Sequence, residues 1–230
     1  MALTVCGLIG SPFYRKVCTL LDEKSIQYDT EVLNPFQANE TFTKVNPMRR
    51  VPLLKDSDVS PDFILPDSSA IVQYIEKKHP SNSLFPKDLA EYGRALWIEE
   101  YADTELAGAI GLKVFRPVVF PQLAGQEPDM EAALDAIRHK LPVIHDYLEN
   151  ELEGREWFAG DSFGIADISV AVHYGNLAFA GYIPSPTRWP NLAAFMRRVG
   201  SKESFTNLHI KAATIFANIN QITIDPSEGL

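Results

Sequence analysis

The stretch that decides the fold is residues 3–17, which read LTVCGLIGSPFYRKV. The apolar run at 3–8 predicts a buried strand, and an amphipathic helix is expected over 12–24. Pro12 suits the first position of a helix. Ser11 before it is typical of a cap, because its side-chain oxygen accepts a hydrogen bond from an unpaired backbone N–H. We therefore expect a small hydroxyl at a strand-to-helix junction.

Ser11 has two interpretations at this point. In the first it is only a helix cap, and the residues around it taken alone favour this interpretation. In the second, the helix N-terminus also stabilises negative charge, so that an anion or thiolate would be held there by the helix dipole and the serine hydroxyl. Residues further along the chain decide between the two.

The rest of the first third of the chain predicts a mixed α/β unit. The expected order is βαβ followed by ββα, with strands at 28–33, 51–54 and 63–65, a short helix at 42–46, a hairpin across 56–62 and a helix at 68–78. Pro52 is unusual inside a strand, because proline cannot donate to a sheet ladder. This order, with a proline in the third strand, resembles the thioredoxin fold.

The remaining two thirds of the chain carry only helical patterns. A linker rich in Ser, Asn and Pro spans 80–88, and helices are expected at 89–114, 130–152, 165–179, 191–199 and 205–217. Pro142 should kink the second of these helices. We expect a loop between the first two helices, marked by Pro117, Pro121, Gly125 and Pro128. The sequence thus predicts an α/β domain over 1–82 and an all-helical domain over 89–230.

Composition narrows the class of protein. The chain has 230 residues and a formal net charge of -9 at pH 7, so a nucleic-acid partner is not expected. It has no run of 18 apolar residues and no signal-peptide pattern, which predicts a cytoplasmic protein without a membrane partner. Cys6 and Cys18 have neither metal nor dithiol spacing, and the five histidines are scattered. No metal site is expected.

In the thioredoxin-like pattern, residues 11–14 take the place of a Cys-x-x-Cys motif, and both cysteines are absent. Disulfide exchange by a protein dithiol is excluded, because the nucleophile must be a thiolate. Binding of a thiol compound at the helix N-terminus is still possible. A cis Val51–Pro52 bond would help to bind such a compound, because the backbone N–H and C=O of Val51 would be exposed to a peptide-like ligand.

Charged and polar residues beside these elements each have two interpretations. Asp67 and Ser68 precede a helix, so either is a plausible cap. Alternatively, Asp67 holds an ammonium group while Ser68 and the helix N-terminus hold a carboxylate, which together would clamp an α-amino acid head group. Arg49 and Arg50 would then bind a second carboxylate, although an arginine pair in a loop is usually just solvated.

The chain resembles the cytosolic glutathione S-transferase superfamily over nearly its whole length. The resemblance rests on four pieces in the order and spacing of that family: residues 11–17, 46–54, 67–71 and 158–167. It implies that Ser11 is the catalytic serine of the serine-type classes and that Val51 and Pro52 clamp the cysteinyl unit of glutathione. It places Asp67 and Ser68 in the γ-glutamyl site, and Arg49 or Arg50 at the glycine carboxylate.

Two positions depart from the family pattern. The family more often has Glu where Asp67 stands, which shortens the reach by one methylene but keeps the charge. The late piece usually has Ser or Thr as the helix cap, and here Gly164 replaces it. Asp167 three residues later, with the apolar Phe163 and Ile168, still fits a cap with a hydrophobic staple. This piece is therefore expected to stabilise the helical domain and to take no part in chemistry.

The resemblance implies a glutathione transferase that uses glutathione as co-substrate, with a detoxification role and a homodimeric assembly. Ser11 would donate a hydrogen bond to the glutathione sulfur, and a hydrophobic electrophile or a peroxide would react with the thiolate. We expect the electrophile between the domains, against Phe13 and Tyr101, because such sites are concave and apolar. Those two side chains could equally belong to the core. Tyr14 is a rival for the catalytic hydroxyl, but it is expected to pack or point away.

Two alternatives come from other classes. A non-catalytic relative would keep the fold as a binding or adaptor protein, but it would have no use for the peptide-clamp residues. A glutathione-dependent isomerase of the maleylacetoacetate type would carry a Ser-Ser-Cys run, which is missing around Ser11.

Overall fold

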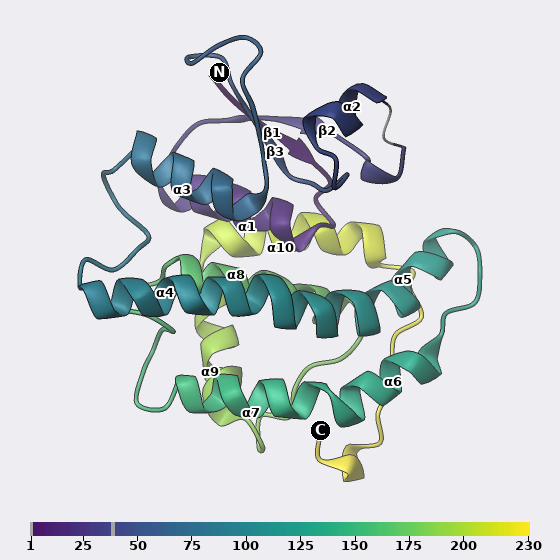
Figure 1. Ribbon diagram of the computed structural model, residues 1–230. Coiled ribbons are helices and arrows are strands. Elements are labelled where there is room, and N and C mark those ends of the chain that lie inside the picture. Colours follow the sequence, from purple (N-terminus) through teal and green to yellow (C-terminus); the bar gives the residue numbers. More distant parts are fainter. Residues whose placement is uncertain (1, 38–39) are drawn as a thin grey trace. The chain divides into compact units, whose positions relative to one another are not determined.

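The computed structural model describes residues 2–37 and 40–230, and the chain divides into two compact units, Met1–Leu84 and Phe85–Leu230. The first unit contains a sheet and the second is built of helices (Figure 1).

The N-terminal unit has a thioredoxin-like α/β fold, as the sequence predicts. Its elements are β1 (Leu3–Gly7), α1 (Pro12–Glu23), β2 (Asp29–Val32), a 3-10 turn (Pro35–Gln37), α2 (Glu40–Val45), β3 (Leu53–Asp56), β4 (Ile64–Pro66) and α3 (Ser68–Lys78). Within the described residues the strand order is β2-β1-β3-β4, with β1 parallel to β2 and the other neighbours antiparallel. The β1-α1-β2 unit and the β3-β4-α3 unit thus form one sheet.

Successive side chains along each strand point to opposite faces of the sheet, so the two faces carry different residues. Val5 and Leu54 pair across β1 and β3 and are fully buried, on the face that α1 and α3 cover. Cys6 and Leu53 pair on the opposite face, where they form a small core with Phe42 of α2. The two faces are therefore covered by different helices, α1 with α3 on one and α2 on the other.

Lys24 holds the chain that leaves this unit. Its side chain is almost fully buried, and its ammonium lies 3.0 Å from Glu76 and 3.1 Å from the carbonyl oxygens of Ser81 and Asn82. A buried ammonium needs such partners, because removing it from water without them is costly. The end of α1, the last turns of α3 and the segment after α3 are thus fixed to one another.

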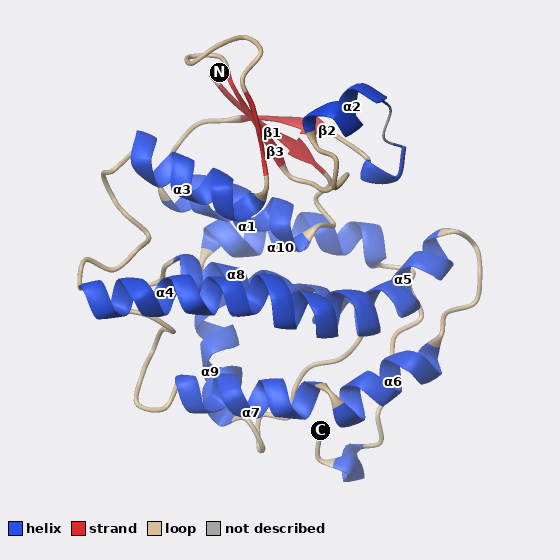
Figure 2. Ribbon diagram, viewed as in Figure 1, coloured by secondary structure: helices blue, strands red, loops and turns tan. Residues whose placement is uncertain are grey.

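The described part of the C-terminal unit contains helices and no strand (Figure 2). They are α4 (Leu89–Tyr101), a π-helical segment (Ala102–Phe115), α5 (Arg116–Leu123), α6 (Met130–His139), α7 (Leu141–Glu151), α8 (Ile165–Phe179), α9 (Pro190–Val199) and α10 (Glu203–Ala213), with 3-10 turns at Thr214–Phe216 and Pro226–Glu228. α8 is buried along almost its whole length and contacts α4, the π-helical segment, α9 and α10. It is the central helix of this unit.

Three details differ from the sequence prediction. Pro52 precedes β3 and does not lie inside it, so its missing N–H leaves the ladder intact. Pro117 and Pro121 lie inside α5, and the loop before α6 comes later, at 124–129. Pro117 is tolerated because it sits at the start of α5, where the hydrogen bonding changes from π to α.

The predicted kink near Pro142 is a complete break. Residues 130–152 form two helices, α6 and α7, which Lys140 separates, and Pro142 is the second residue of α7. Proline fits there because the first N–H groups of a helix have no partner within it.

One helical run among the described residues, 89–123, is long and apolar enough to cross a membrane by length and composition alone. Its mean hydropathy reaches 1.2 over an 18-residue window, of which 39% is buried within the structure. The core helix of a folded helical unit meets the same criterion, and this run contacts the buried α8.

Candidate functional site

The strand register brings the predicted site residues to one end of the sheet. Cys6 near the end of β1 pairs with Leu53, the first residue of β3, and Leu53 pairs with Pro66, the last residue of β4. Ser11 follows β1, Pro52 precedes β3, and Asp67 follows β4. The helix N-termini of α1 and α3 begin at the same end, one residue after Ser11 and one after Asp67.

Ser11 caps α1. Its backbone is extended, with φ -77° and ψ 127°, and its side-chain oxygen accepts a hydrogen bond of 3.4 Å from the backbone N–H of Tyr14. A hydroxyl has one O–H donor as well as acceptor lone pairs. The cap uses the acceptor side only, so the O–H remains able to donate to a ligand. The two interpretations of Ser11 are thus compatible with each other.

Tyr14 is a core residue. Its ring packs against β1, and a Cβ atom built on Gly7 would approach a ring carbon of Tyr14 to 2.5 Å. Gly7 is required here for this close contact. Burial raises the pKa of Tyr14 further above the range where a phenol ionises. The expectation that Tyr14 packs is confirmed.

The loop before β3 is held by Asn46. The Val51–Pro52 peptide bond is cis, as the sequence predicts. The buried Asn46 accepts a hydrogen bond of 2.9 Å from the N–H of Arg49 and donates one of 2.7 Å from its side chain to the carbonyl of Arg50. Both arginine side chains are exposed. Asn46 begins the sequence piece 46–54, and Asn before Pro is a turn signal, which is consistent with its place in this loop.

Asp67 caps α3 from a rare backbone conformation. Its φ of 77° is unusual for any residue other than glycine, and such strain is concentrated at functional sites. Its Oδ1 accepts hydrogen bonds of 3.0 Å and 3.1 Å from the N–H groups of Ser69 and Ala70. These two bonds use one carboxylate oxygen, and the other can accept from a ligand. Ser68, the first residue of α3, is buried.

Lys16 links the two helix starts. Its ammonium donates a hydrogen bond of 3.2 Å to Ser69 Oγ, although the two residues are 53 positions apart. This contact has no local sequence signal. It adds a positive charge to an end of the sheet where two helix dipoles already point their positive ends. The carboxylate of Asp67 lies at the same end, so that positive and negative groups are both present there.

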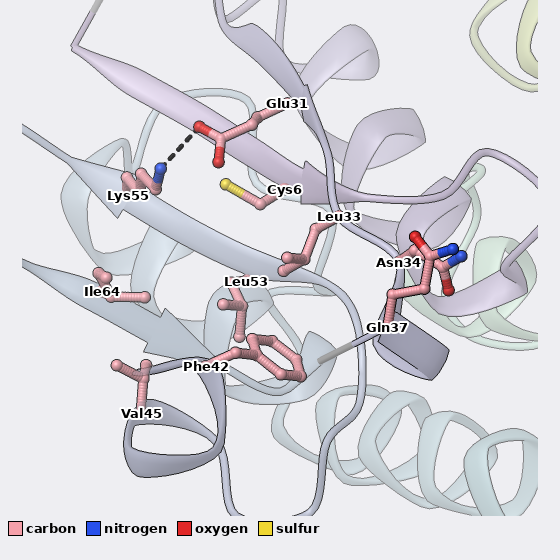
Figure 3. Close-up of a pocket in the computed structure, with 10 residues that line it drawn as sticks. All are labelled: Cys6, Glu31, Leu33, Asn34, Gln37, Phe42, Val45, Leu53, Lys55 and Ile64. Carbon is pink, nitrogen blue, oxygen red and sulfur yellow. Dashed lines mark hydrogen bonds and ion pairs between the residues drawn. The ribbon is translucent and has the colours of Figure 1, made fainter. Parts of the chain in front are cut away.

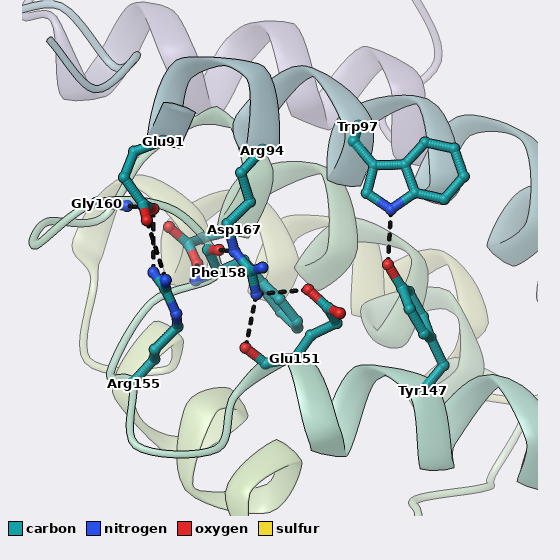
Figure 4. Close-up of polar contacts among 9 residues, drawn as sticks. All are labelled: Glu91, Arg94, Trp97, Tyr147, Glu151, Arg155, Phe158, Gly160 and Asp167. Carbon is teal, nitrogen blue, oxygen red and sulfur yellow. Dashed lines mark hydrogen bonds and ion pairs between the residues drawn. The ribbon is translucent and has the colours of Figure 1, made fainter. Parts of the chain in front are cut away.

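The two residues predicted at the electrophile site belong to different units. Phe13 is half-buried in α1 of the N-terminal unit. Tyr101 ends α4 in the C-terminal unit, where its ring centroid lies 4.7 Å from that of Tyr147 and 6.0 Å from that of Trp97. Burial raises the pKa of Tyr101 to about 12, so its hydroxyl is neutral at physiological pH. Trp97 Nε1 donates a hydrogen bond of 2.6 Å to Tyr147 Oη (Figure 4).

The late motif is structural, as its residues predict. Asp167 Oδ1 accepts a hydrogen bond of 2.9 Å from Phe158 N–H (Figure 4). Its Oδ2 accepts one of 2.9 Å from Gly164 N–H. Gly164 has no side chain, so the carboxylate three residues later stabilises the start of α8 in its place. The same loop is tied to α4 by the bidentate pair of Glu91 with Arg155, whose bonds are both 3.0 Å.

Within the described residues, no group of three or more His, Cys, Asp or Glu side chains is arranged to hold a metal ion. Cys6 and Cys18 are buried free thiols.

Comparison with known proteins gives the family. Residues 5–83 match the glutathione S-transferase N-terminal domain, and residues 120–198 match the glutathione S-transferase C-terminal domain. The chain belongs to the glutathione S-transferase family. It is 30% identical over 200 residues to glutathione S-transferase GstB of Escherichia coli, an alignment that covers 86% of this chain and 92% of that protein.

Two further relatives differ in what their names describe. A glutathione S-transferase from Rhodospirillum rubrum superimposes with a TM-score of 0.80 at 26% identity, covering 90% of this chain and 91% of that one. FtsZ-localized protein A of Caulobacter vibrioides is 26% identical over 177 residues, which are 75% of this chain and 76% of that protein. The family therefore includes relatives named for a transferase activity and one named for a cellular location.

Proposed function

We propose that this protein is a serine-type glutathione transferase. The observation that carries the proposal is the register of β1, β3 and β4, which groups Ser11, Val51, Pro52 and Asp67 with two helix N-termini at one end of the sheet. A tripeptide with two carboxylates, one ammonium group and a thiol has a complementary set of groups.

Ser11 is proposed as the catalytic residue. Its O–H, which the cap leaves available, donates a hydrogen bond to the sulfur of bound glutathione, and the N-terminus of α1 adds favourable potential. An unperturbed thiol has a pKa of about 8.5, and each unit of lowering corresponds to about 1.4 kcal/mol of preferential thiolate binding. A lowering of one or two units makes the bound thiol mostly ionised near neutral pH.

The remaining residues bind the peptide. The backbone N–H and C=O of Val51, positioned by Pro52, pair with the cysteinyl unit. The second carboxylate oxygen of Asp67 accepts from the γ-glutamyl ammonium. Ser68 holds the adjacent carboxylate through its hydroxyl and its backbone N–H, because the next two N–H groups of α3 already donate to Asp67 Oδ1. Arg49 or Arg50 binds the glycine carboxylate, because both side chains reach solvent beside Val51.

The second substrate is a hydrophobic electrophile or a peroxide. In conjugation, the thiolate forms a sulfur–carbon bond as the leaving group departs with its electron pair, and the thiol proton passes to solvent. Phe13 and Tyr101 are proposed to contact the electrophile. We also propose that the protein acts in the cytoplasm and that it is a homodimer. Light scattering tests the second point, because a homodimer has twice the mass of the 25.7 kDa chain.

The alternative is a non-catalytic binding protein on the same fold. The relative named FtsZ-localized protein A favours it, because that name refers to a location and not to a reaction. Retention of Ser11, Asp67 and the Val51–Pro52 pair favours the transferase, because a binding role elsewhere on the surface does not require them.

Retention on immobilised glutathione, followed by conjugation assays with aryl halides, epoxides and hydroperoxides, separates the two. A transferase is retained and turns over at least one electrophile class. A protein that neither binds glutathione nor reacts would contradict the proposal.

A further inference from the structure

A separate hollow lies in the N-terminal unit, on the face of the sheet that α2 covers (Figure 3). Its volume is about 310 Å³. The residues that line it are Cys6, Glu31, Leu33, Asn34, Gln37, Phe42, Val45, Leu53, Lys55 and Ile64. None of them belongs to the proposed glutathione site, so the hollow needs its own explanation.

Most of the wall is apolar. Cys6, Phe42 and Leu53 are buried, and Leu33, Val45 and Ile64 pack against them. These side chains come from β1, α2, β3, β4 and the chain after β2, so the hollow is walled by several elements of one unit. A ligand inside would remove apolar surface from water on more than one side, which favours binding.

The polar part of the wall carries no net charge. Lys55 Nζ and Glu31 Oε2 form an ion pair of 2.6 Å, and their side chains are 39% and 51% exposed, which places them at the rim. Asn34 and Gln37 contribute neutral amides, which both donate and accept hydrogen bonds. Burial raises the pKa of the Cys6 thiol to about 11, so the thiol is neutral too.

We propose that this hollow binds a small, uncharged, largely apolar molecule that carries one hydrogen-bonding group. Its volume is at the lower end of ligand pockets, which span about 300–1,000 Å³. A charged ligand would give up hydration without meeting an unpaired opposite charge, because Lys55 and Glu31 already neutralise each other. The amides of Asn34 and Gln37 are the hydrogen-bonding partners for the ligand's polar group.

A matched pair of probes tests whether the hollow prefers an uncharged ligand to a charged one. 1-Naphthol and 1-naphthoate have the same ring system, and only the second is charged at pH 7. We expect 1-naphthol to perturb the amide resonances of Cys6 and Leu53 in the full chain and to bind at least about tenfold more tightly than 1-naphthoate, a difference of about 1.4 kcal/mol. Perturbations confined to other parts of the chain would overturn the proposal, because the probe would then bind elsewhere.

A filling variant tests the location. Ile64→Phe adds a ring on the wall while keeping a residue that favours strands, and it should weaken 1-naphthol binding by about tenfold or more. Val59→Phe is the matched control, because Val59 is exposed in the loop between β3 and β4. It should leave the dissociation constant unchanged. If Ile64→Phe unfolds, Val45→Phe fills the same space from α2. Unchanged affinity in a folded filling variant would refute the site.

The rim gives a second, independent test. Glu31→Gln leaves Lys55 without its carboxylate, so the wall gains a net positive charge. We expect 1-naphthoate to bind at least about tenfold more tightly to this variant than to the wild type, with 1-naphthol little changed. Equal affinities of the variant and the wild type for 1-naphthoate would contradict the role of the ion pair.

Discussion

Lys16 donates a hydrogen bond of 3.2 Å to Ser69, and this contact joins the second turn of α1 to the first turn of α3. Ser11 caps the first of these helices and Asp67 caps the second. The proposed thiol-binding and γ-glutamyl-binding ends of the site are therefore linked by one side chain. Its loss should affect ligand binding even though Lys16 is not proposed to touch glutathione.

Replacing Lys16 by Met tests this link. Met keeps an unbranched apolar side chain and removes the ammonium, and a hydrogen bond to a charged group contributes about 1.5–3 kcal/mol. We expect glutathione to bind about tenfold or more weakly, as measured by calorimetry, together with a lower melting temperature. Lys77→Met, at an exposed position on α3, is the control and should bind as the wild type does. Wild-type affinity in Lys16→Met would show that the two helix starts act independently.

Asp67→Asn separates the cap from the ligand contact. Asn keeps a side-chain oxygen for the N–H groups of Ser69 and Ala70 but loses the charge that we propose binds the γ-glutamyl ammonium. Glutathione affinity should fall by about 1.5–3 kcal/mol while the melting temperature changes little.

Asp88 provides a matched control for this substitution. It caps α4 with the same pair of hydrogen bonds, of 2.9 Å from Ala90 and 3.0 Å from Glu91, although its own backbone is extended, and it is outside the proposed site. Asp88→Asn should leave glutathione binding unchanged. Equal losses of affinity in the two variants would mean that Asp67 acts only as a cap.

His145 makes stability depend on pH. It is fully buried on α7, its ring centroid lies 6.1 Å from that of Tyr182 and 4.7 Å from that of Trp189, and burial lowers its pKa from 6.5 to about 3. The folded state therefore keeps His145 neutral, whereas the unfolded state binds a proton there below pH 6.5. The free energy of unfolding is thus unaffected by His145 above pH 6.5 and decreases as the pH falls from 6.5 toward 3. Between pH 7 and pH 5 this loss amounts to about 2 kcal/mol.

His145→Phe should remove that pH dependence while keeping an aromatic ring in place. The measurement is the free energy of unfolding by urea between pH 7 and pH 5, in which the wild type should lose about 2 kcal/mol relative to the variant. His139→Phe, at an exposed position, is the control. A parallel pH dependence in wild type and His145→Phe would rule out His145 as its source.

Asp167→Asn tests the late motif. Asn offers one acceptor where the N–H groups of Phe158 and Gly164 require two, and an unsatisfied buried donor costs about 1–3 kcal/mol. Unfolding monitored by calorimetry should shift to lower temperature. Affinity for glutathione at 25 °C should not change. A loss of affinity in the folded variant would give this motif a role in binding that its geometry does not suggest.

Local patterns predicted the caps and missed the contacts between distant segments. Ser11 before Pro12 and Asp167 after Gly164 have short-range signals, because a cap and its helix are neighbours in sequence. The Lys16–Ser69 bond has no such signal, since it depends on how α1 and α3 pack on the same face of the sheet.

Prolines were the main source of error in the helical unit. Pro117 and Pro121 predicted a loop, but the helical run continues through both of them as α5. Pro117 lies where the hydrogen bonding of the helical run changes from π to α, and the sequence does not show that a π-helical segment ends just before it. Pro121 lies inside α5, and no local pattern shows that the helix continues through it. Sequence patterns also could not predict the hollow beneath α2, because its wall combines single residues from several elements.

The pKa of bound glutathione in Ser11→Ala and Ser11→Thr tests the central claim most directly. Thiolate absorbance is titrated in the complex of each variant. Both variants should fold, since losing the cap costs only about 1 kcal/mol. If Ser11 stabilises the thiolate, Ser11→Ala should raise the pKa by one unit or more and lower turnover at neutral pH by about tenfold for each 1.4 kcal/mol lost, whereas Ser11→Thr, which keeps the hydroxyl, stays near wild type. An unchanged pKa and full conjugation activity in Ser11→Ala, with only a lower melting temperature, would contradict the account and leave Ser11 as a helix cap.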